Sequence, residues 1–476
     1  MTAQPLANRF AEYGQHLRFE ALPAETVHEA KRRFIDSIAT AVGAMDADAY
    51  AIARRVALRF NGERPVHLLG GGKSGVEWAT FVNGLLIRYL DYNDTYLSLE
   101  PAHPSDNLAS VLAVGDLANA PGSALIVAAV LAYDIQCRLC DAASLRKHGF
   151  DHVTYGAISS AAAACKLLDL DAAKTTHALG IAGVCNTALR QTRSGEMSMW
   201  KGCAFANAAR NGVFAALLAG EGMTGPAPIF EGELGFMKLL TGAFTIGPMG
   251  GEQGRPYMLN QTYIKFWPAE YHSQSAIDAA LQLRSQVSPT KGRWPAEVTK
   301  KITKLDIHTF NAAVDIIGKD PEKWRPRTRE TADHSLPYCT AVALVDGEIT
   351  AAQFDESRFT DPVLLELVAK TAVHRDAQLS ERYPRGTPNR ITLTLADGST
   401  LVKEVEFPRG HAQNPMTDAE VEQKFRAEVE PRLGKDKADR ILAACWSLDK
   451  LRRTGDLLEL VQTAERTNPA GRTPGT

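Results

Sequence analysis

Hydrophobic residues recur at helical spacing over most of the first 240 positions of the chain. In residues 23–45, apolar side chains fall three or four positions apart, at Val27, Ala30, Phe34, Ile38 and Val42. The same spacing predicts further helices over 47–60, 75–90, 106–118, 122–145, 153–168, 171–187 and 200–221. Several of these segments are rich in alanine and glycine, which lets helices approach closely. The pattern therefore predicts a bundle of many helices rather than alternating strands and helices.

The pattern changes in the middle of the chain. Residues 300–310 and 390–407 alternate apolar and polar side chains, which is typical of strands, and Asp397-Gly398 predicts a hairpin turn between two of them. Helical spacing returns over 271–287 and 334–347. This part of the sequence therefore predicts a compact α+β unit.

Helices are expected again near the C-terminus, over 416–429, 437–448 and 457–466. Thr417 and Glu420 have the spacing of a capping box at the start of the first of them. The last residues, TNPAGRTPGT, are expected to fray.

The predicted fold is mainly α. It consists of a large all-α helical domain with an inserted, smaller α+β lid domain. We place the first part of the helical domain at 1–266, the lid at 267–407, and the returning C-terminal helices at 408–476.

Composition narrows the class of protein. The chain has 476 residues, 45% of them hydrophobic, and a net charge of −2, so no broad basic surface for nucleic acid is expected. The N-terminus lacks the pattern of a signal or transit peptide. The longest apolar run, 124–135, is too short to span a bilayer, so neither a membrane nor a nucleic acid is an expected partner. A cytoplasmic location is the expectation.

The seven cysteines do not suggest a disulfide framework. Cys137 and Cys140 form a C-x-x-C within a helical segment, where positions i and i+3 share a face. Two semi-buried thiols are the simpler interpretation. An iron–sulfur centre built with a distant third thiol is the alternative. We predict no metal and no cofactor.

The segment DYNDTYLSLEPAHPSDN (91–107) is the most informative candidate for chemistry. Carboxylates, hydroxyls and one imidazole crowd into it directly after a helix, at Asp91, Asp94, Thr95, His103, Ser105 and Asp106. A catalytic loop and a hydrated turn both use these residue types. The segment alone does not separate the two interpretations.

Four other segments supply matching groups. They provide His152 at a helix start, Arg193 and Lys201 around another, Lys265 and His272 near Pro268, and His334, Ser335 and Tyr338 in ETADHSLPY. Lysines and arginine can hold carboxylates, while Asp91, His103, His152 and Tyr338 can exchange protons. Together they favour an acidic, multi-carboxylate substrate and proton abstraction beside a carboxylate. Each group taken alone is also an ordinary cap, core residue or snorkelling side chain.

Common catalytic motifs are missing from the sequence. LLGGGKSG (68–75) is similar to a phosphate-binding loop, but His67 occupies the position of the first glycine and we expect no strand before it. The sequence contains neither H-E-x-x-H nor G-x-S-x-G.

The chain resembles the MmgE/PrpD family, which includes 2-methylcitrate dehydratases of propionate metabolism, cis-aconitate decarboxylase and an iminodisuccinate epimerase. The resemblance rests on LDYNDTYLSLEPAHPSDN, KFWPAEYHSQSAIDAA, RETADHSLPY and GHAQNPMTDAEVEQKF, in this order over nearly the whole chain. It implies a helical domain with an α+β lid, a homodimer, and an active site between the domains.

The resemblance also implies roles for individual residues. By motif, the pocket residues are Asp91, Thr95, His103, His152, Lys201, Lys265 and Tyr338. We expect His103, His152, Asp91 and Tyr338 to be catalytic, without assigning which histidine is acid and which is base. Substrate binding is expected of Thr95, Lys201, Lys265, His272 and Arg193.

Two departures bear on the substrate. Glu270 follows the Pro-Ala dipeptide, where the decarboxylase has a histidine, and HSLPY differs from the D-H-C-x-Q-Y form of dehydratases. We favour a metal-independent hydro-lyase acting on a tricarboxylate such as 2-methylcitrate or citrate. The expected partner is thus a small di- or tricarboxylate substrate. The alternatives are a decarboxylase, epimerase or isomerase on a related acid, and a non-catalytic helical binding protein.

Overall fold

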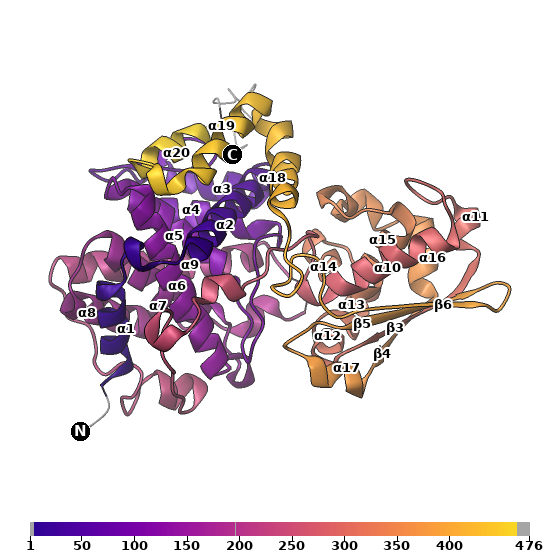
Figure 1. The fold of residues 1–476 in the computed structure, drawn as a ribbon, viewed down its shortest axis with the longest axis horizontal. Helices are drawn as coiled ribbons and strands as arrows, with labels where there is room; N and C mark the ends of the chain where they lie inside the picture. Colours follow the sequence, from indigo (N-terminus) through magenta and orange to yellow (C-terminus); the bar gives the residue numbers. More distant parts are fainter. Residues whose placement is uncertain (1–3, 196, 464–476) are drawn as a thin grey trace, which may run out of the picture.

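The computed structural model describes residues 4–195 and 197–463, and it divides them into a helical body and a smaller α+β lid (Figure 1). This confirms the predicted fold class. The helices of the helical body before the lid are α1 (Leu6–His16), α2 (Ala24–Gly43), α3 (Asp48–Ala57), α4 (Val76–Tyr89), α5 (Leu108–Leu117), α6 (Gly122–Ala142), α7 (Val153–Leu167), α8 (Ala172–Cys185) and α9 (Trp200–Gly220).

Small residues bring the central helices α4, α7 and α9 into close contact. A Cβ added at Gly84 of α4 would lie 3.0 Å from the Cβ of Ala206 in α9. One added at Gly156 of α7 would lie 2.4 Å from the Phe205 ring. The alanine- and glycine-rich segments therefore form the tightly packed centre of the helical body.

Helix α6 runs through this centre. Among the described residues it is the one helix with the length and hydropathy to cross a membrane, but 83% of its most apolar window is buried inside the protein. It also extends beyond the apolar run at 124–135, because the polar residues Gln136 and Arg138 continue the same helix. These features identify α6 as a core helix.

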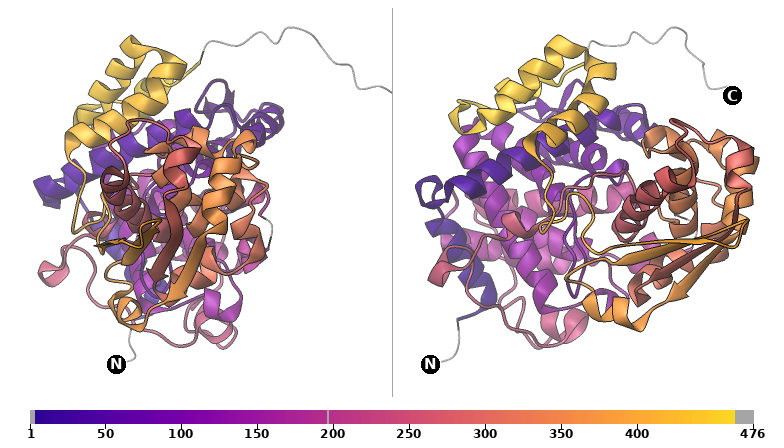
Figure 2. Two further views of the ribbon diagram at one scale, coloured as in Figure 1. Left: turned by 90° about the vertical axis from the view of Figure 1, so that its right-hand side faces the viewer. Right: turned by 45° about the vertical axis from the view of Figure 1, so that its right-hand side comes forward.

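Three C-terminal helices, α18 (Asp418–Leu433), α19 (Lys435–Trp446) and α20 (Thr454–Leu460), pack on the helical body (Figures 1 and 2). Helices α18 and α19 lie beside α2, and α20 packs against α5. Val421 and Phe425 are fully buried in the same core as Phe34 of α2. The capping box of Thr417 and Glu420 is confirmed at the start of α18. The expected fraying of 467–476 falls outside the described residues.

The lid contains one four-stranded sheet and several helices. Its strands are β3 (Ile302–Thr309), β4 (Thr371–Arg375), β5 (Asn389–Leu395) and β6 (Thr400–Val405). Its helices are α10 (Gln274–Val287), α11 (Ala296–Thr299), α12 (Asn311–Ala313), α13 (Pro321–Trp324), α14 (Arg329–Ala332), α15 (Leu336–Asp346), α16 (Pro362–Ala369) and α17 (Ala377–Arg382).

The strand order in this sheet is β4-β3-β5-β6. Strand β4 runs parallel to β3, while β3, β5 and β6 are mutually antiparallel neighbours. The predicted turn joins β5 to β6, with Gly398 at a φ of 83°. Helices α10 and α15 lie along one face, where Leu305, Ile307 and Ile391 belong to a second, separate core (Figure 1).

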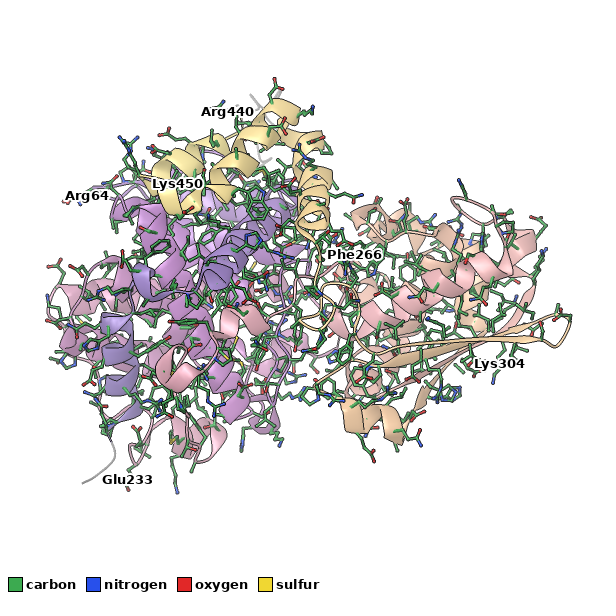
Figure 3. The ribbon with its side chains drawn as sticks, viewed as in Figure 1. Arg64, Glu233, Phe266, Lys304, Arg440 and Lys450 are labelled. Atoms are coloured by element: carbon green, nitrogen blue, oxygen red, sulfur yellow. The ribbon has the colours of Figure 1, made fainter. Side chains whose placement is uncertain are left out.

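The chain passes between helical body and lid twice, and Phe266 lies at the first crossing (Figure 3). The hydroxyl of Tyr92 donates to the carbonyl of Phe266 at 2.8 Å. Nearby, Tyr89 at the end of α4 donates to Glu330 of α14 at 3.3 Å. These contacts place the end of α4 against the lid.

Several local expectations differ from the structure. A short strand, β1 (Val66–His67), does precede the glycine-rich segment, and it pairs with β2 (Lys73–Ser74). Helices α1 and α16 and strand β4 were not predicted. The stretch 222–262 contains only short 3-10 and π turns, because prolines and glycines interrupt it.

All seven cysteines are free thiols. Cys137 and Cys140 are fully buried in α6, and burial raises the pKa of both thiols well above the usual value. Neither belongs to a cluster of possible metal ligands within the described part of the chain. The arrangement agrees with two core thiols.

Candidate active site

Asp91 stands at the centre of the candidate site, directly after α4. Its backbone adopts a left-handed conformation with a φ of 52°, which Asp tolerates better than most residues. This turn ends the helix and directs the buried carboxylate toward three other segments. The acidic loop, residues 91–107, begins here.

Cations surround the Asp91 carboxylate. Arg88, one helical turn earlier, donates to Oδ1, and the Nζ of Lys265 lies 2.9 Å from the same oxygen and 2.7 Å from the Asp91 carbonyl. Lys201 Nζ lies 3.4 Å from Oδ2. Burial alone would raise the pKa of Asp91, but Arg88, Lys201 and Lys265 together hold it well below the usual range.

The other carboxylates of the acidic loop maintain its shape. Asp94 accepts hydrogen bonds from the backbone of Ser105 at 2.9 Å and from the hydroxyl of Tyr133 at 2.8 Å. Asn93 donates to Asp106 at 2.8 Å. Burial raises the pKa of Asp106 to about 7. The polar residues of this segment thus serve two purposes: some maintain the shape of the loop, while Asp91, Thr95 and His103 face the cavity.

His103 is held in one tautomer. Its Nδ1 lies 2.8 Å from the carbonyl oxygen of Asp94, which can only accept, so Nδ1 carries the proton. Nε2 then accepts from Arg88 at 3.0 Å, and Thr95 Oγ1 lies 3.2 Å from Nδ1. Burial, with the Arg88 and Lys265 charges, keeps the pKa of His103 well below its usual value. His103 is therefore neutral at physiological pH.

His152, at the start of α7, faces His103 with 5.9 Å between ring centroids. Its Nδ1 lies 3.0 Å from Asp151, whose second oxygen is 2.9 Å from Arg193 Nε. Neither ring nitrogen has a hydrogen-bond partner among the described residues. Burial lowers the pKa of His152 to about 3. This is a second neutral imidazole with an unused lone pair.

The lid contributes two more histidines from the other side. His272 Nδ1 lies 2.6 Å from Glu270 Oε1, and His272 Nε2 lies 3.3 Å from the hydroxyl of Tyr383. His334 bonds through Nδ1 to Asp333, and its Nε2 lies 3.5 Å from Asp91 Oδ2. Burial and the Lys201 charge lower the pKa of His334.

These groups enclose a cavity of about 80 Å³ between the helical body and the lid. Within the described residues, six cationic side chains line it against two carboxylates, Asp91 and Glu270. The cations are Arg88, Arg146, Arg190, Arg193, Lys265 and Lys323. Leu97, Pro101, Met197, Tyr271 and Ile316 supply an apolar part of the wall. The electrostatics suit an anion with several negative charges and a small apolar portion.

Most of the site residues predicted from sequence meet at this cavity. Seven of them line it: Asp91, Thr95, His103, His152, Arg193, Lys265 and His272. Lys201 joins them through Asp91, and its buried ammonium has no hydrogen-bond partner among the described residues.

Tyr338 is placed elsewhere. Its hydroxyl donates to the carbonyl of Gln353 at 2.8 Å, and its ring packs between Phe354 and Phe359 in the lid core. It does not line the cavity. The physical reason is that Pro337 and Tyr338 occupy the first turn of α15, whose surface is buried within the lid.

Sequence reasoning missed several residues of the site. Arg88 could have been found from its spacing of three residues before Asp91 at a helix end. Lys424 of α18 has no such signal. Its Nζ donates to the carbonyls of Tyr92 and Lys265, each at 2.8 Å, and pairs with Asp36 at 2.5 Å. A C-terminal helix thereby fixes the backbone of both segments that meet at Asp91.

Asp91, Asp333 and His334 are close enough together to hold a metal ion. The charge around them argues for a different use. Arg88 and Lys265 bind one oxygen of Asp91, and Lys201 and His334 approach the other. A divalent ion here would face three cations within a few ångströms, which repel it strongly in a buried setting.

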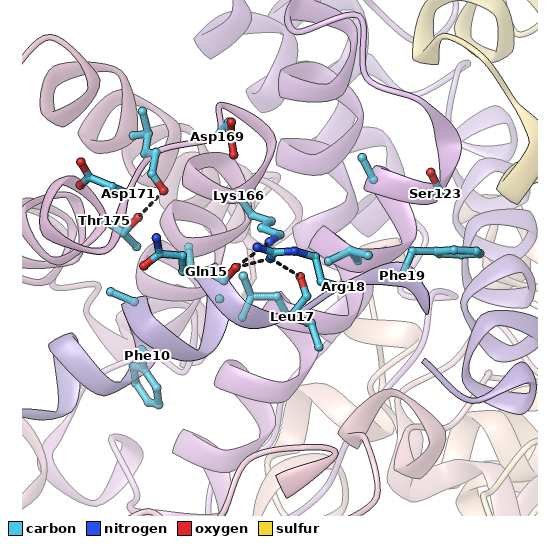
Figure 4. Close-up of a pocket in the computed structure, with 17 residues that line it drawn as sticks. Phe10, Gln15, Leu17, Arg18, Phe19, Ser123, Lys166, Asp169, Asp171 and Thr175 are labelled. Carbon is cyan, nitrogen blue, oxygen red and sulfur yellow. Dashed lines mark hydrogen bonds between the residues drawn. The ribbon is translucent and has the colours of Figure 1, made fainter. Parts of the chain in front are cut away.

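A larger cavity, of about 560 Å³, lies on the opposite side of the helical body between α1 and α6 to α8 (Figure 4). Arg18 and Lys166 both donate to the carbonyl of Gln15 there. Asp169 and Asp171 are at its rim, and much of its wall is apolar. It has no imidazole and no converging acid and base, so we assign the chemistry to the smaller cavity at Asp91.

Comparison with known proteins identifies two family domains in the chain. The chain matches the MmgE/PrpD N-terminal domain over residues 8–248 and the MmgE/PrpD C-terminal domain over residues 267–449. The first match contains the acidic loop, His152 and Lys201, and the second contains Glu270, His272 and His334. The two matched parts therefore supply opposite walls of the cavity.

Similar proteins span most of the chain. The 2-methylcitrate dehydratase of Cupriavidus necator is 32% identical over 399 residues, 79% of each chain. That of Escherichia coli K12 is 31% identical over 404 residues, again 79% of each. A fungal alkylcitrate dehydratase is 32% identical over 385 residues, which cover 75% of this chain and 73% of the relative.

Proposed function

This chain belongs to the MmgE/PrpD family, and we propose that it is a hydro-lyase that removes water from an alkylcitrate such as 2-methylcitrate. The observation that carries the proposal is the charge of the cavity: six cations face two carboxylates, beside histidines held neutral by burial. The names of the similar dehydratases support the same reaction.

The cavity wall favours an alkylated tricarboxylate over citrate. Three carboxylates would offset most of the excess of four cations in the cavity wall. The side chains of Leu97, Met197 and Ile316 give an alkyl substituent an apolar surface. Burying one methyl group there contributes roughly 0.8 kcal/mol.

Removal of water begins with loss of the proton next to a carboxylate. A neutral imidazole is the appropriate base, and His103 and His152 are both neutral in this site. His152 Nε2 is the freer of the two, because Arg88 already occupies His103 Nε2. Negative charge then develops on the substrate carboxylate, where Lys201 and Lys265 stabilise it. Asp91 positions both lysines, and Thr95 holds His103.

The direct test is an absorbance assay for the unsaturated product. We expect turnover of 2-methylcitrate, slower turnover of citrate, and a loss of at least about 100-fold in kcat/KM for Lys265→Met. If 2-methylcitrate, citrate and cis-aconitate all remain unchanged at excess enzyme, the proposal fails. Release of carbon dioxide from cis-aconitate, or epimerisation without elimination, would instead assign the site to another reaction of a carbanion.

We propose further that the reaction needs no metal ion. Support comes from the three cations around Asp91, which already supply the charge stabilisation that a metal would provide. Turnover is expected to be unchanged after dialysis against a chelator. Loss of activity that returns with added Fe²⁺ or Mg²⁺ would contradict this.

A homodimer is the proposed assembly. Support comes from exposed apolar side chains on α9 and its neighbours: Met199, Trp200 and Phe214 are each more than 40% exposed, and exposed Phe60 stacks on Trp78 at 5.1 Å. Light scattering coupled to size-exclusion chromatography should give twice the monomer mass of 51.7 kDa. A monomer mass at micromolar concentration would contradict the proposal.

A further inference from the structure

Glu270 and His272 form a carboxylate–imidazole pair on the lid wall of the cavity. Glu270 Oε1 lies 2.6 Å from His272 Nδ1, and Oε2 accepts from the His272 backbone at 2.8 Å. His272 is only 2% exposed, and Asn389 holds its carbonyl with a hydrogen bond of 2.8 Å. Both carboxylate oxygens are thus committed to one residue, which fixes the direction of the ring.

The environment of this histidine differs from that of the others. His152 and His334 also have a carboxylate partner, Asp151 and Asp333 respectively. They differ from His272 in their cations: guanidinium groups flank His103 and His152, and an ammonium lies beside His334. The groups in direct contact with His272 are a carboxylate, the Tyr383 hydroxyl and the ring of Phe310. A carboxylate at 2.6 Å stabilises an imidazolium, whereas a guanidinium opposes one.

More distant charges complete the surroundings. Lys265 and His334 also act on the Glu270 carboxylate. Arg146 acts on Tyr383 from the helical body. Burial would raise the pKa of Glu270, but its interactions with His272, His334 and Lys265 lower it, so the carboxylate stays ionised. The negative partner of the imidazole is therefore maintained.

We infer that His272, positioned by Glu270, is the general acid that protonates the departing hydroxyl group, an assignment that rests on the proposed dehydration. Neutral His152 or His103 accepts the proton from the carbon next to the carboxylate. The electrons of that C–H bond form the C=C bond, and the C–O bond breaks with its electrons on oxygen. The Nε2 proton of His272 moves to that oxygen, and water leaves. The two imidazoles then exchange their protons with solvent.

This arrangement divides the reaction between the two bodies of the protein. The base candidates come from the helical body and the acid comes from the lid. An enzyme that uses an acid and a base at the same pH places the two groups in different electrostatic environments. Here cations lie beside the base candidates, whereas a carboxylate contacts His272. The contact from Nε2 to Tyr383 is long, at 3.3 Å, so a substrate hydroxyl can compete for that proton.

The test separates proton abstraction from departure of the hydroxyl. His272→Gln should lose about 100-fold or more in the rate of water loss from 2-methylcitrate. It should still exchange the substrate C–H proton in deuterated water, read by NMR. It should also still eliminate fluoride from an analogue that carries fluorine in place of the hydroxyl, since fluoride needs little protonation. His152→Gln should lose C–H exchange and both eliminations.

A second variant tests the pair itself. Glu270→Gln keeps a hydrogen-bond acceptor near Nδ1 but removes the charge, so the alkaline limb of the kcat profile should move to lower pH by one unit or more. Glu270→Asp should restore part of the shift. His16→Gln, which alters an exposed histidine far from the cavity, should leave the position of that limb unchanged.

The outcomes distinguish the two proposals. If the wild-type protein transforms no tricarboxylate, the proposed function fails. If the wild-type protein is active but His272→Gln dehydrates at the wild-type rate, the acid assignment fails. It also fails if His272→Gln loses C–H exchange together with elimination while circular dichroism shows a folded protein, or if the Glu270→Gln profile does not move.

Discussion

At the scale of single residues, the main contribution of Asp91 is its negative charge. One carboxylate stands among Arg88, Lys201 and Lys265, in a place where almost no solvent screens them. Removing one partner of a buried ionic network leaves the others uncompensated. Without the Asp91 carboxylate, Arg88, Lys201 and Lys265 would therefore repel one another and destabilise the folded protein.

Asp91→Asn should lower the free energy of unfolding by about 3–5 kcal/mol, as measured by urea denaturation. Asn accepts the left-handed backbone, so the change isolates the charge. A tricarboxylate should raise the melting temperature of this variant more than that of the wild type. Asp46→Asn is a matched control on the surface, expected within about 0.5 kcal/mol of wild type. Equal midpoints for both variants would contradict the prediction.

Buried neutral histidines also predict how stability depends on pH. Burial lowers the pKa of His152 to about 3 and that of His411 to about 4, whereas the unfolded chain titrates near about 6.5. Between these values the unfolded state binds more protons, so stability falls as the pH drops below about 6.5. Each of the two histidines lowers the free energy of unfolding by up to about 1.4 kcal/mol for each pH unit in this range.

Denaturation at pH 7.5, 6 and 5 measures this slope. His411 lies outside the cavity, and His411→Gln should reduce the slope by about the contribution of one buried histidine. His16→Gln, at an exposed position, should leave the slope unchanged. A slope that does not respond to His411→Gln would show that other groups dominate.

At the scale of helices and strands, small residues set the distances in the helical body. Gly156 of α7 faces the Phe205 ring so closely that an added Cβ would lie 2.4 Å away. At Gly220, near the end of α9, the nearest atom would be 3.6 Å from such a Cβ, which is an ordinary contact. Replacing the glycine by alanine should therefore affect stability differently at these two positions.

Gly156→Ala should destabilise the protein by about 1–3 kcal/mol, because α7 and α9 must separate. Gly220→Ala should be neutral or stabilise it by up to about 1 kcal/mol, because alanine favours the helix. Thermal unfolding of both variants makes the comparison. Equal destabilisation would mean that helix propensity, not close packing, explains these glycines.

The same scale shows what sequence could predict. Long helices with strong periodicity, such as α2 and α9, were predicted within a few residues, and the capping box located the start of α18. Strand β4 was missed because five residues between two helices carry little periodicity. Its place beside β3 depends on a parallel pairing across more than sixty residues.

The site divides in a similar way. Residues with reactive side chains in unusual segments, such as His103 and Lys265, could be identified from sequence and resemblance. Lys424 could not, because a lysine on a highly charged C-terminal helix resembles any surface lysine until the fold buries it. Tyr338 was assigned by motif, and the packing of α15 directs it into the lid core.

At the scale of the whole molecule, the cavity is too small for its proposed ligand. Its volume of about 80 Å³ holds two or three waters at about 30 Å³ each, whereas ligand sites usually reach at least about 300 Å³. We therefore expect the lid to move away from the helical body when substrate enters. The two chain crossings, near Phe266 and near residues 408–416, are the available hinges.

We expect a tricarboxylate to shift this equilibrium measurably. Small-angle X-ray scattering should show a change in the radius of gyration on addition of 2-methylcitrate, and hydrogen exchange should change at both crossings. Sulfate at equal ionic strength serves as the control for charge screening. Identical scattering and exchange with and without substrate would contradict a moving lid.

The order of segments along the chain has a consequence for biosynthesis. The core of the lid uses residues from Ala269 to Leu393, while the core of the helical body needs residues as late as Val461. On the ribosome, the lid can therefore finish folding while the body that synthesis began first still lacks α18 to α20. Until α18 emerges, Lys424 cannot join the backbones at Tyr92 and Lys265. The active site is thus assembled only at the end of translation, and a chain truncated after the lid would have a complete lid and no functional site.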